Sequence, residues 1–259
     1  MNISDFSEFK KIAESLGDHI FWKPLDQSEI EEVSTFIDKI NESKSWPRGR
    51  NQEKGALLED FAVYVFARFQ GAEVEKNRRP TDNETDVEVT LSEIFAPEFM
   101  RQYLSPKIIC ECKNKATSSV DVGMVAKLAE LLPSRGSKIG IFFSINGISG
   151  NGWRYGEGKR KKILLKTGIP IISFRVDELR QLLDGRNFYT MIKEKIKNLY
   201  DEIDDDSPDT PSTGHIEYKK RMLEIISHFV KCKLIDDTDA EKLRVKIIEV
   251  YGPIDEDVG

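Results

Sequence analysis

The 259-residue sequence has few of the residues that staple small secreted domains or cross a membrane. It contains only three cysteines, two of them in Cys110-Glu111-Cys112, which is too few for a disulfide framework. No apolar run reaches the roughly 18 residues that span a membrane, and the N-terminus shows no basic segment followed by an apolar one. We therefore expect a cytoplasmic protein without membrane contact.

Histidine is equally scarce, and this excludes several kinds of catalytic and metal site. His19, His215 and His228 are the only three in the chain. A His-rich metal site or a histidine-based nuclease motif therefore has too few residues to draw on. Cys110 and Cys112 have no set of Cys and His partners that would complete a zinc quartet, so the sequence indicates no zinc centre.

The net charge of −6 is distributed unevenly along the chain. Lys/Arg and Asp/Glu number 5 and 10 in residues 1–45, 26 and 19 in residues 46–200, and 8 and 16 in residues 201–259. A basic middle between acidic ends is typical of a segment that binds a polyanion. Simple segregation of surface charge gives the same pattern, so charge alone does not decide between the two.

Apolar periodicity predicts an α/β protein with a central sheet covered by helices. The predicted helices are 4–17, 27–43, 53–70, 121–132, 157–167, 176–184, 188–203, 216–232 and 238–250. The predicted strands are 72–76, 86–91, 107–113, 138–144 and 170–175. Ser28 with Glu31 predicts a capping box on the second helix, and Gly71 predicts the end of the third.

Breaks in this pattern predict the domain organisation. Residues 45–50 interrupt the helical pattern, and an acidic stretch with prolines follows residue 203. The expected segments are an N-terminal helical extension at 1–45, a main domain at 46–200, an acidic linker at 201–214, and a C-terminal helical hairpin with its tail at 215–259.

The C-terminal hairpin carries an apolar stripe that two short helices cannot bury by themselves. On the first helix the stripe consists of Met222, Ile225, Ile226 and Phe229, and on the second helix it consists of Leu243, Ile247 and Ile248. We expect a homodimer through this hairpin, because a second copy is the commonest partner for such a face. The alternative is a monomer in which the hairpin folds back on its own core.

Carboxylates and a lysine on two predicted strands are the most informative residues about function. Alternation along the third strand points Glu111 and Lys113 to one face and the two cysteines to the other. If the second strand is its neighbour, Asp86 and Glu111 can hold one hard cation such as Mg²⁺. Lys113 would then orient or deprotonate an attacking water, or stabilise charge in the transition state. Taken alone, Glu-X-Lys is more often a salt bridge at a strand end.

Glu59 adds a fourth charged side chain, from the predicted helix 53–70. It interrupts an apolar region between Leu58 and Phe61, where a carboxylate without a partner is costly. One alternative is a role in the site, and the other is an ordinary acid favoured by the helix dipole. The residue by itself does not separate them.

The ordered set of these residues resembles the restriction-endonuclease-like nuclease superfamily and, within it, the Mrr-like branch. The family signature consists of a helix Glu, an Asp and an (Asp/Glu)-X-Lys strand. The matching segments are Lys54 to Glu59, Asn83 to Asp86, Glu111 to Asn114 and, for the Mrr-like branch, Gly140 to Ile148. Thr85 stands where the signature often has proline. The resemblance covers about residues 50–185.

This resemblance implies a mixed central sheet flanked by helices, and metal-dependent hydrolysis of phosphodiester bonds with Mg²⁺ or Mn²⁺. It implies DNA before RNA as the substrate, although nothing in the residues excludes RNA, and a role in restriction or anti-phage defence. Asp86 and Glu111 are the implied metal ligands, and Glu59 and Lys113 are the further implied catalytic residues. The alternative is a catalytically silent nuclease-like fold that binds nucleic acid or a protein.

Basic residues near the expected active edge are the candidates for contact with nucleic acid. Lys and Arg neutralise phosphates, and the interleaved Trp153 and Tyr155 can stack on bases. The candidates are Arg78 and Arg79 between the first two strands, then Arg154, Lys159, Arg160, Lys161 and Lys162. The alternatives are a capped hairpin for the first pair and a solvated helix face for the second group.

Overall fold

The computed structural model describes most of the chain. The described residues are 17–78, 85–92, 96–203 and 218–252, together with Ser7, Glu8 and Lys11. Most of the predicted helix 4–17 lies outside them, as do Arg79 and residues 204–214 of the predicted linker. Among the described helices, none is long and apolar enough to cross a membrane.

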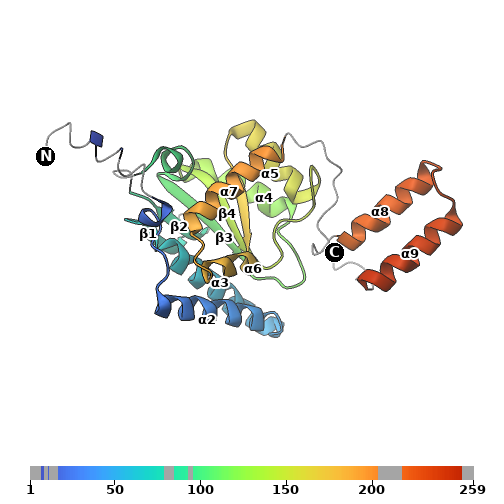
Figure 1. Ribbon diagram of the computed structural model, residues 1–259, viewed down its shortest axis with the longest axis horizontal. Helices are drawn as coiled ribbons and strands as arrows, with labels where there is room; N and C mark the ends of the chain where they lie inside the picture. Colours follow the sequence, from blue (N-terminus) through green and yellow to red (C-terminus); the bar gives the residue numbers. More distant parts are fainter. Residues whose placement is uncertain are drawn as a thin grey trace.

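Five strands form one mixed sheet in the order β1-β2-β3-β4-β5 (Figure 1). The strands are β1 Glu73–Arg78, β2 Thr85–Thr90, β3 Lys107–Lys113, β4 Ser137–Ser144 and β5 Ile171–Arg175. β1, β2 and β3 pair antiparallel, whereas β3, β4 and β5 pair parallel. The predicted mixed α/β sheet is confirmed. The parallel pairing brings the carboxyl ends of β3, β4 and β5 to one edge of the sheet.

Helices cover both faces of this sheet (Figure 1). The α-helices are α2 Gln27–Ser43, α3 Asn51–Phe66, α4 Val122–Ser134, α5 Tyr155–Thr167, α6 Val176–Leu179, α7 Phe188–Asp201, α8 Tyr218–Lys231 and α9 Asp237–Tyr251. The shorter helices are η1 Asp18–Ile20, η2 Arg48–Arg50, η3 Met100–Leu104 and η4 Arg180–Leu182. The helix predicted over 176–184 is therefore only one α-helical turn followed by a 3-10 turn.

Side chains of β3 alternate between two apolar clusters on opposite faces of the sheet. Cys110 and Cys112 are buried in the cluster that contains residues of α2, α3 and α7. Ile109 and Phe142 belong to the other cluster, together with residues of α4. The prediction that the two cysteines are small buried hydrophobes is confirmed. Because Glu111 alternates with them, it is directed to the face that α4 covers.

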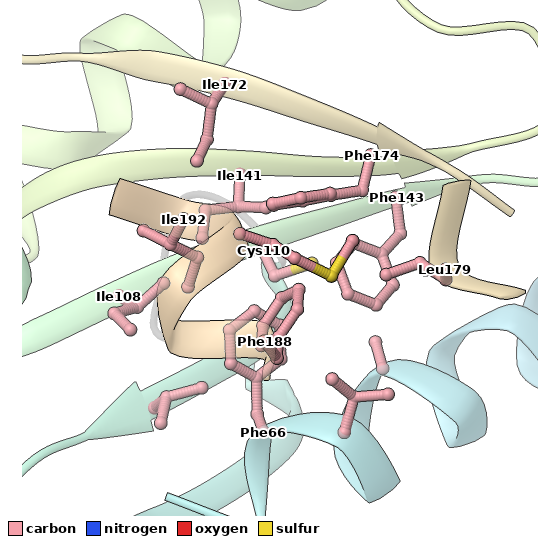
Figure 2. Packing of buried hydrophobic residues seen from close by; sticks show 14 of the residues in the cluster. Phe66, Ile108, Cys110, Ile141, Phe143, Ile172, Phe174, Leu179, Phe188 and Ile192 are labelled. Carbon is pink, nitrogen blue, oxygen red and sulfur yellow. The ribbon is translucent and has the colours of Figure 1, made fainter. Parts of the chain in front are cut away.

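Phe188, the first residue of α7, joins several elements at the centre of the larger cluster (Figure 2). Its fully buried ring contacts the rings of Trp22, Phe66, Phe69, Phe143 and Phe174. The N-cap residue Asn187 accepts hydrogen bonds from the first turn of α7 and donates one to the Trp22 carbonyl. Phe188 is thereby held in place between α3, the sheet and the segment that precedes α2.

Helix α3 ends at Phe66, four residues before the predicted end at residue 70. The chain leaves the helix because Phe69 forms a bridge with Trp22, and the Gln70 N–H donates to the Phe21 carbonyl. Gly71 turns the chain toward β1 with a φ of +67°. The predicted stop was therefore wrong in position, because pairing with a distant segment overrides the local helical pattern.

The capping box of α2 consists of Asp26 and Glu29, and the prediction of Ser28 with Glu31 was wrong by two residues. The Asp26 carboxylate accepts from the Glu29 N–H at 3.0 Å, and Glu29 accepts from the Asp26 N–H at 2.7 Å. Hydrogen bonds from Arg68, followed by the Asp26 N–H, lower the pKa of Glu29 to about 2. The cap therefore also ties the start of α2 to the end of α3.

Helices α8 and α9 form a hairpin beside the rest of the protein (Figure 1). Ile226, Ala240 and Ile247 are buried between the two helices. Two side chains of α8 reach the start of α5. The Arg221 guanidinium lies 4.9 Å from the centre of the Tyr155 ring, and Glu224 lies 3.4 Å from Arg154.

Candidate active site

The candidate site lies where β2 and β3 separate. Their antiparallel pairing ends at Val87 opposite Cys110, which confirms that the two strands are neighbours. At the next position the carboxylate of Asp86, at 2.7 Å, accepts the hydrogen bond of the Cys112 N–H. This bond holds Asp86 beside the carboxyl end of β3.

Lys113 connects two carboxylates at this edge. Its Nζ lies 3.2 Å from Glu111 Oε2 and 3.7 Å from Asp86 Oδ2. The Glu111 side chain is 7% exposed, whereas those of Asp86 and Lys113 are 19% and 26% exposed. The structure therefore brings three of the four predicted catalytic residues together at a site that solvent reaches.

The electrostatics of the site disfavour an uncompensated charge on Glu111. Burial raises its pKa and the charge of Asp86 raises it further, while Lys113 offsets only part of the effect. Burial by itself would lower the pKa of Lys113, but the charges of Asp86 and Glu111 outweigh it and leave that pKa raised. Glu111 Oε1 is buried and has no hydrogen-bond partner among the described residues. The site thus contains a buried carboxyl oxygen that a bound cation or a hydrogen-bond donor would satisfy.

The donor set fits a hard divalent cation. Within the described residues no group of three or more His, Cys, Asp and Glu side chains is placed to hold a metal ion. Mg²⁺ needs fewer, because it is usually bound by one or two carboxylates and keeps several waters. The unsatisfied Glu111 Oε1 and the nearby Asp86 carboxylate supply two such oxygens. Mg²⁺ or Mn²⁺ therefore fits these two residues.

Glu59 lies close to this group but contacts β1. Its carboxylate is 3.4 Å from Lys76 Nζ and accepts from Asn77 Nδ2 at 3.3 Å. Burial raises the pKa of the Cys112 thiol, with smaller contributions from Cys110 and then from the charges of Asp86 and Glu59. Glu59 and Asp86 are therefore both near Cys112, and a catalytic role for Glu59 stays a prediction.

Two further residues border the site without having been assigned a role from the sequence. The charge of Lys127, an exposed residue of α4, lowers the pKa of Glu111 against the effect of burial. The Asn114 amide donates to the Lys54 carbonyl at 2.8 Å and to Ser43 Oγ at 3.1 Å. Two features of the sequence could have indicated these residues: Lys127 lies on the helix that follows β3, and Asn114 comes directly after Lys113.

Comparison with protein families identifies the part of the chain that carries this site. A model of the Mrr catalytic domain, described as restriction endonuclease, matches residues 52–174. These residues run from the first turn of α3 into β5 and include Glu59, Asp86, Glu111 and Lys113.

This segment matches the Mrr branch of the restriction-endonuclease-like family. The resemblance derived from the sequence motifs is therefore confirmed, and with it a nuclease of the restriction type. No curated protein and no solved structure matches the chain. Helices α2, α6, α7, α8 and α9 lie outside the matched Mrr segment.

Two of the predicted phosphate-binding residues in the Mrr segment are already paired with carboxylates. Arg160 lies 2.5 Å from Glu157 and 2.9 Å from Glu202. Lys161 is 5% exposed, with its Nζ 3.5 Å from Glu202 and 5.7 Å from the centre of the Trp153 ring. These pairs connect α5 to the end of α7.

The other predicted phosphate-binding residues are more accessible or lie at the edge of the described chain. Arg154 is 61% exposed and lies 3.4 Å from Glu224 of the hairpin. Lys159 is half-buried and Lys162 is exposed. Arg78 ends β1 opposite Thr85, and Arg79 lies outside the described residues. Contact with nucleic acid stays a prediction for the whole set.

Proposed function

We propose that the Mrr-type domain hydrolyses phosphodiester bonds of DNA with Mg²⁺ or Mn²⁺ and serves restriction or anti-phage defence in the cytoplasm. The observation that supports this most is the convergence of Asp86, Glu111 and Lys113 at one sheet edge. The Asp-to-Glu-X-Lys arrangement places two oxygen donors and one ammonium group on a surface that solvent reaches. The unsatisfied oxygen of Glu111 adds support for a bound cation.

In this proposal each residue of the group has its own role. Asp86 and Glu111 hold the cation, which supplies Lewis-acid stabilisation of the phosphate charge when bound. Lys113 donates from its ammonium group to a phosphate oxygen or to the attacking water, and stabilises the negative charge that develops. Glu59 positions a water beside Asp86.

The decisive experiment exposes the purified full chain to plasmid DNA, single-stranded DNA and RNA, in Mg²⁺ and in EDTA. We expect DNA cleavage in Mg²⁺ and none in EDTA. Binding of nucleic acid without cleavage in either buffer would favour the catalytically silent alternative. Cleavage of RNA alone would contradict DNA as the substrate.

Lys113→Met should lower the rate of DNA cleavage by about a hundredfold, the scale of losing one charge-stabilising donor. The rise in melting temperature with Mg²⁺ should persist, because the lysine is not a metal ligand. Lys115→Met is the matched control, since Lys115 is an exposed lysine two residues further along the chain. A wild-type rate in Lys113→Met would contradict the role given to this ammonium group.

We also propose that the α8–α9 hairpin joins two copies of the chain, because much of its apolar surface is uncovered. Its exposed apolar residues are Phe229, Leu234, Leu243, Val245, Ile248 and Val250. Light scattering should give twice the mass of the 29.7 kDa chain, and Ile248→Glu should halve that mass. Leu165→Glu, at an exposed leucine of α5, should leave it unchanged. A monomeric wild-type protein would contradict the proposal.

A further inference from the structure

The turn between α2 and α3 carries a concentration of positive charge that begins abruptly. Residues 1–43 contain four Lys/Arg and ten Asp/Glu, whereas residues 44–54 contain four Lys/Arg and a single Glu. The four cations are Lys44, Arg48, Arg50 and Lys54. The charge of the chain thus changes sign where it leaves α2.

This basic turn is attached directly to the candidate site. Asn114, the residue after Lys113, donates to the Lys54 carbonyl at one end of the turn and to Ser43 Oγ at the other. The Asn114 side chain is half-buried, so these are not the chance contacts of a free surface amide. The basic turn and the carboxyl end of β3 are therefore held side by side.

Internal contacts hold the turn in one conformation. The Arg50 guanidinium lies 3.5 Å from the centre of the Trp46 ring and donates to Glu53 at 2.7 and 3.0 Å. Lys54 Nζ donates to the Trp46 carbonyl at 2.6 Å. The one acid of the turn is thus occupied by Arg50, and preorganisation of this kind reduces the entropy that a ligand must remove.

Arg48 differs from Arg154 and Arg160, two of the arginines predicted to bind phosphate. It lies in η2, is exposed, and its side chain makes no ion pair or hydrogen bond with the described part of the chain. By contrast Arg154 reaches Glu224, and Arg160 is held by two carboxylates. Arg48 is therefore a guanidinium without an ion-pair partner in the described part of the chain, on a turn whose two ends are held by Asn114, the residue after Lys113.

We propose that Arg48 binds a backbone phosphate of the DNA strand next to the phosphate that Lys113 contacts. The inference rests on the proposed function, because it requires DNA to lie across the edge formed by Asp86, Glu111 and Lys113. Guanidinium groups suit phosphate oxygens, since their fixed donors can bond two of them at once. Lys44, which is also exposed, extends the same positive surface along the strand.

The test measures binding of the full-length protein to a fluorescent DNA duplex in EDTA, over a series of salt concentrations. Arg48→Ala should weaken binding about fivefold, and the slope of log K against log salt should become shallower by about 0.9, the value for one lost phosphate contact. Arg48→Lys keeps the charge and should restore the wild-type salt slope, with an affinity between those of the wild type and Arg48→Ala because lysine cannot bond two phosphate oxygens at once. A purely structural role for Arg48 would not change the salt slope.

Arg101→Ala is the matched control. Arg101 is an exposed arginine in η3, ahead of the amino end of β3 and thus at the opposite edge of the sheet from Lys113. Equal affinity and salt slope in the Arg48 and Arg101 variants would overturn the inference, as would an Arg48 effect confined to duplex RNA.

The assay contains no metal, so it separates this inference from the proposed function. An Arg48 effect on DNA binding in a protein that cleaves nothing would support the inference and remove the nuclease proposal. A wild-type protein that binds no DNA would overturn both.

Discussion

Glu111→Gln is expected to lower DNA cleavage by about a thousandfold or more, because a metal ligand and its charge are lost together. Glutamine keeps the shape of the side chain but offers only one neutral acceptor oxygen. Mg²⁺ should raise the melting temperature of the wild-type protein, since a ligand that binds only the folded state stabilises it. That rise should disappear in the variant, and the same two results are expected for Asp86→Asn.

The Glu111→Gln variant is expected to fold. Glu111 is buried beside a second carboxylate, and burial followed by the Asp86 charge raises its pKa. An ionised group whose folded-state pKa is raised reduces stability at neutral pH, so a neutral amide should not lower the melting temperature in EDTA. Loss of activity without loss of apo stability would mark Glu111 as a functional residue.

Glu130→Gln provides the control for both measurements, because Glu130 is an exposed acid on α4. It should keep the wild-type cleavage rate and the wild-type response to Mg²⁺. Undiminished cleavage by Glu111→Gln, or an unchanged Mg²⁺ response, would remove the metal-ligand assignment.

Phe188→Ala should have the largest effect on stability, a loss of about 3–5 kcal/mol, the range for removing a large aromatic side chain from a core. The ring is fully buried and contacts five other aromatic rings from four parts of the chain. The cavity would open between α3, α7 and the sheet (Figure 2). Urea unfolding followed by circular dichroism measures the change.

Leu165→Ala is the comparison for this experiment. Leu165 is 63% exposed on α5, outside the proposed dimer surface, so its removal should cost about 0.5 kcal/mol or less. If the two alanine variants lost the same stability, the aromatic cluster around Phe188 would not be the main source of cohesion between α7 and the sheet.

The sequence by itself determined the strands and the shared face of Glu111 and Lys113, whereas the position of Asp86 beside them depended on the pairing of β2 with β3. Alternation is a local property with a period of two, so Glu111 and Lys113 had to lie opposite Cys110 and Cys112. Each strand was predicted to within two residues, because its apolar run is bounded by turn residues. The helices α2 and α4 followed equally well from their spacing.

Only the tertiary structure decided the features that depend on residues far apart in the sequence. The end of α3 was set by pairing of residues 68–70 with residues 21–23, and the centre of the core was set by Phe188 meeting rings from four other segments.

Tertiary packing also determined which charged side chains form ion pairs. Arg160 pairs with Glu157 and Glu202 and is half-buried, and Glu59 pairs with Lys76, whereas Arg48 makes no ion pair with the described residues. Sequence periodicity predicts the face of the element on which a side chain lies. The residue that it contacts depends on how the elements pack in three dimensions, which periodicity does not predict.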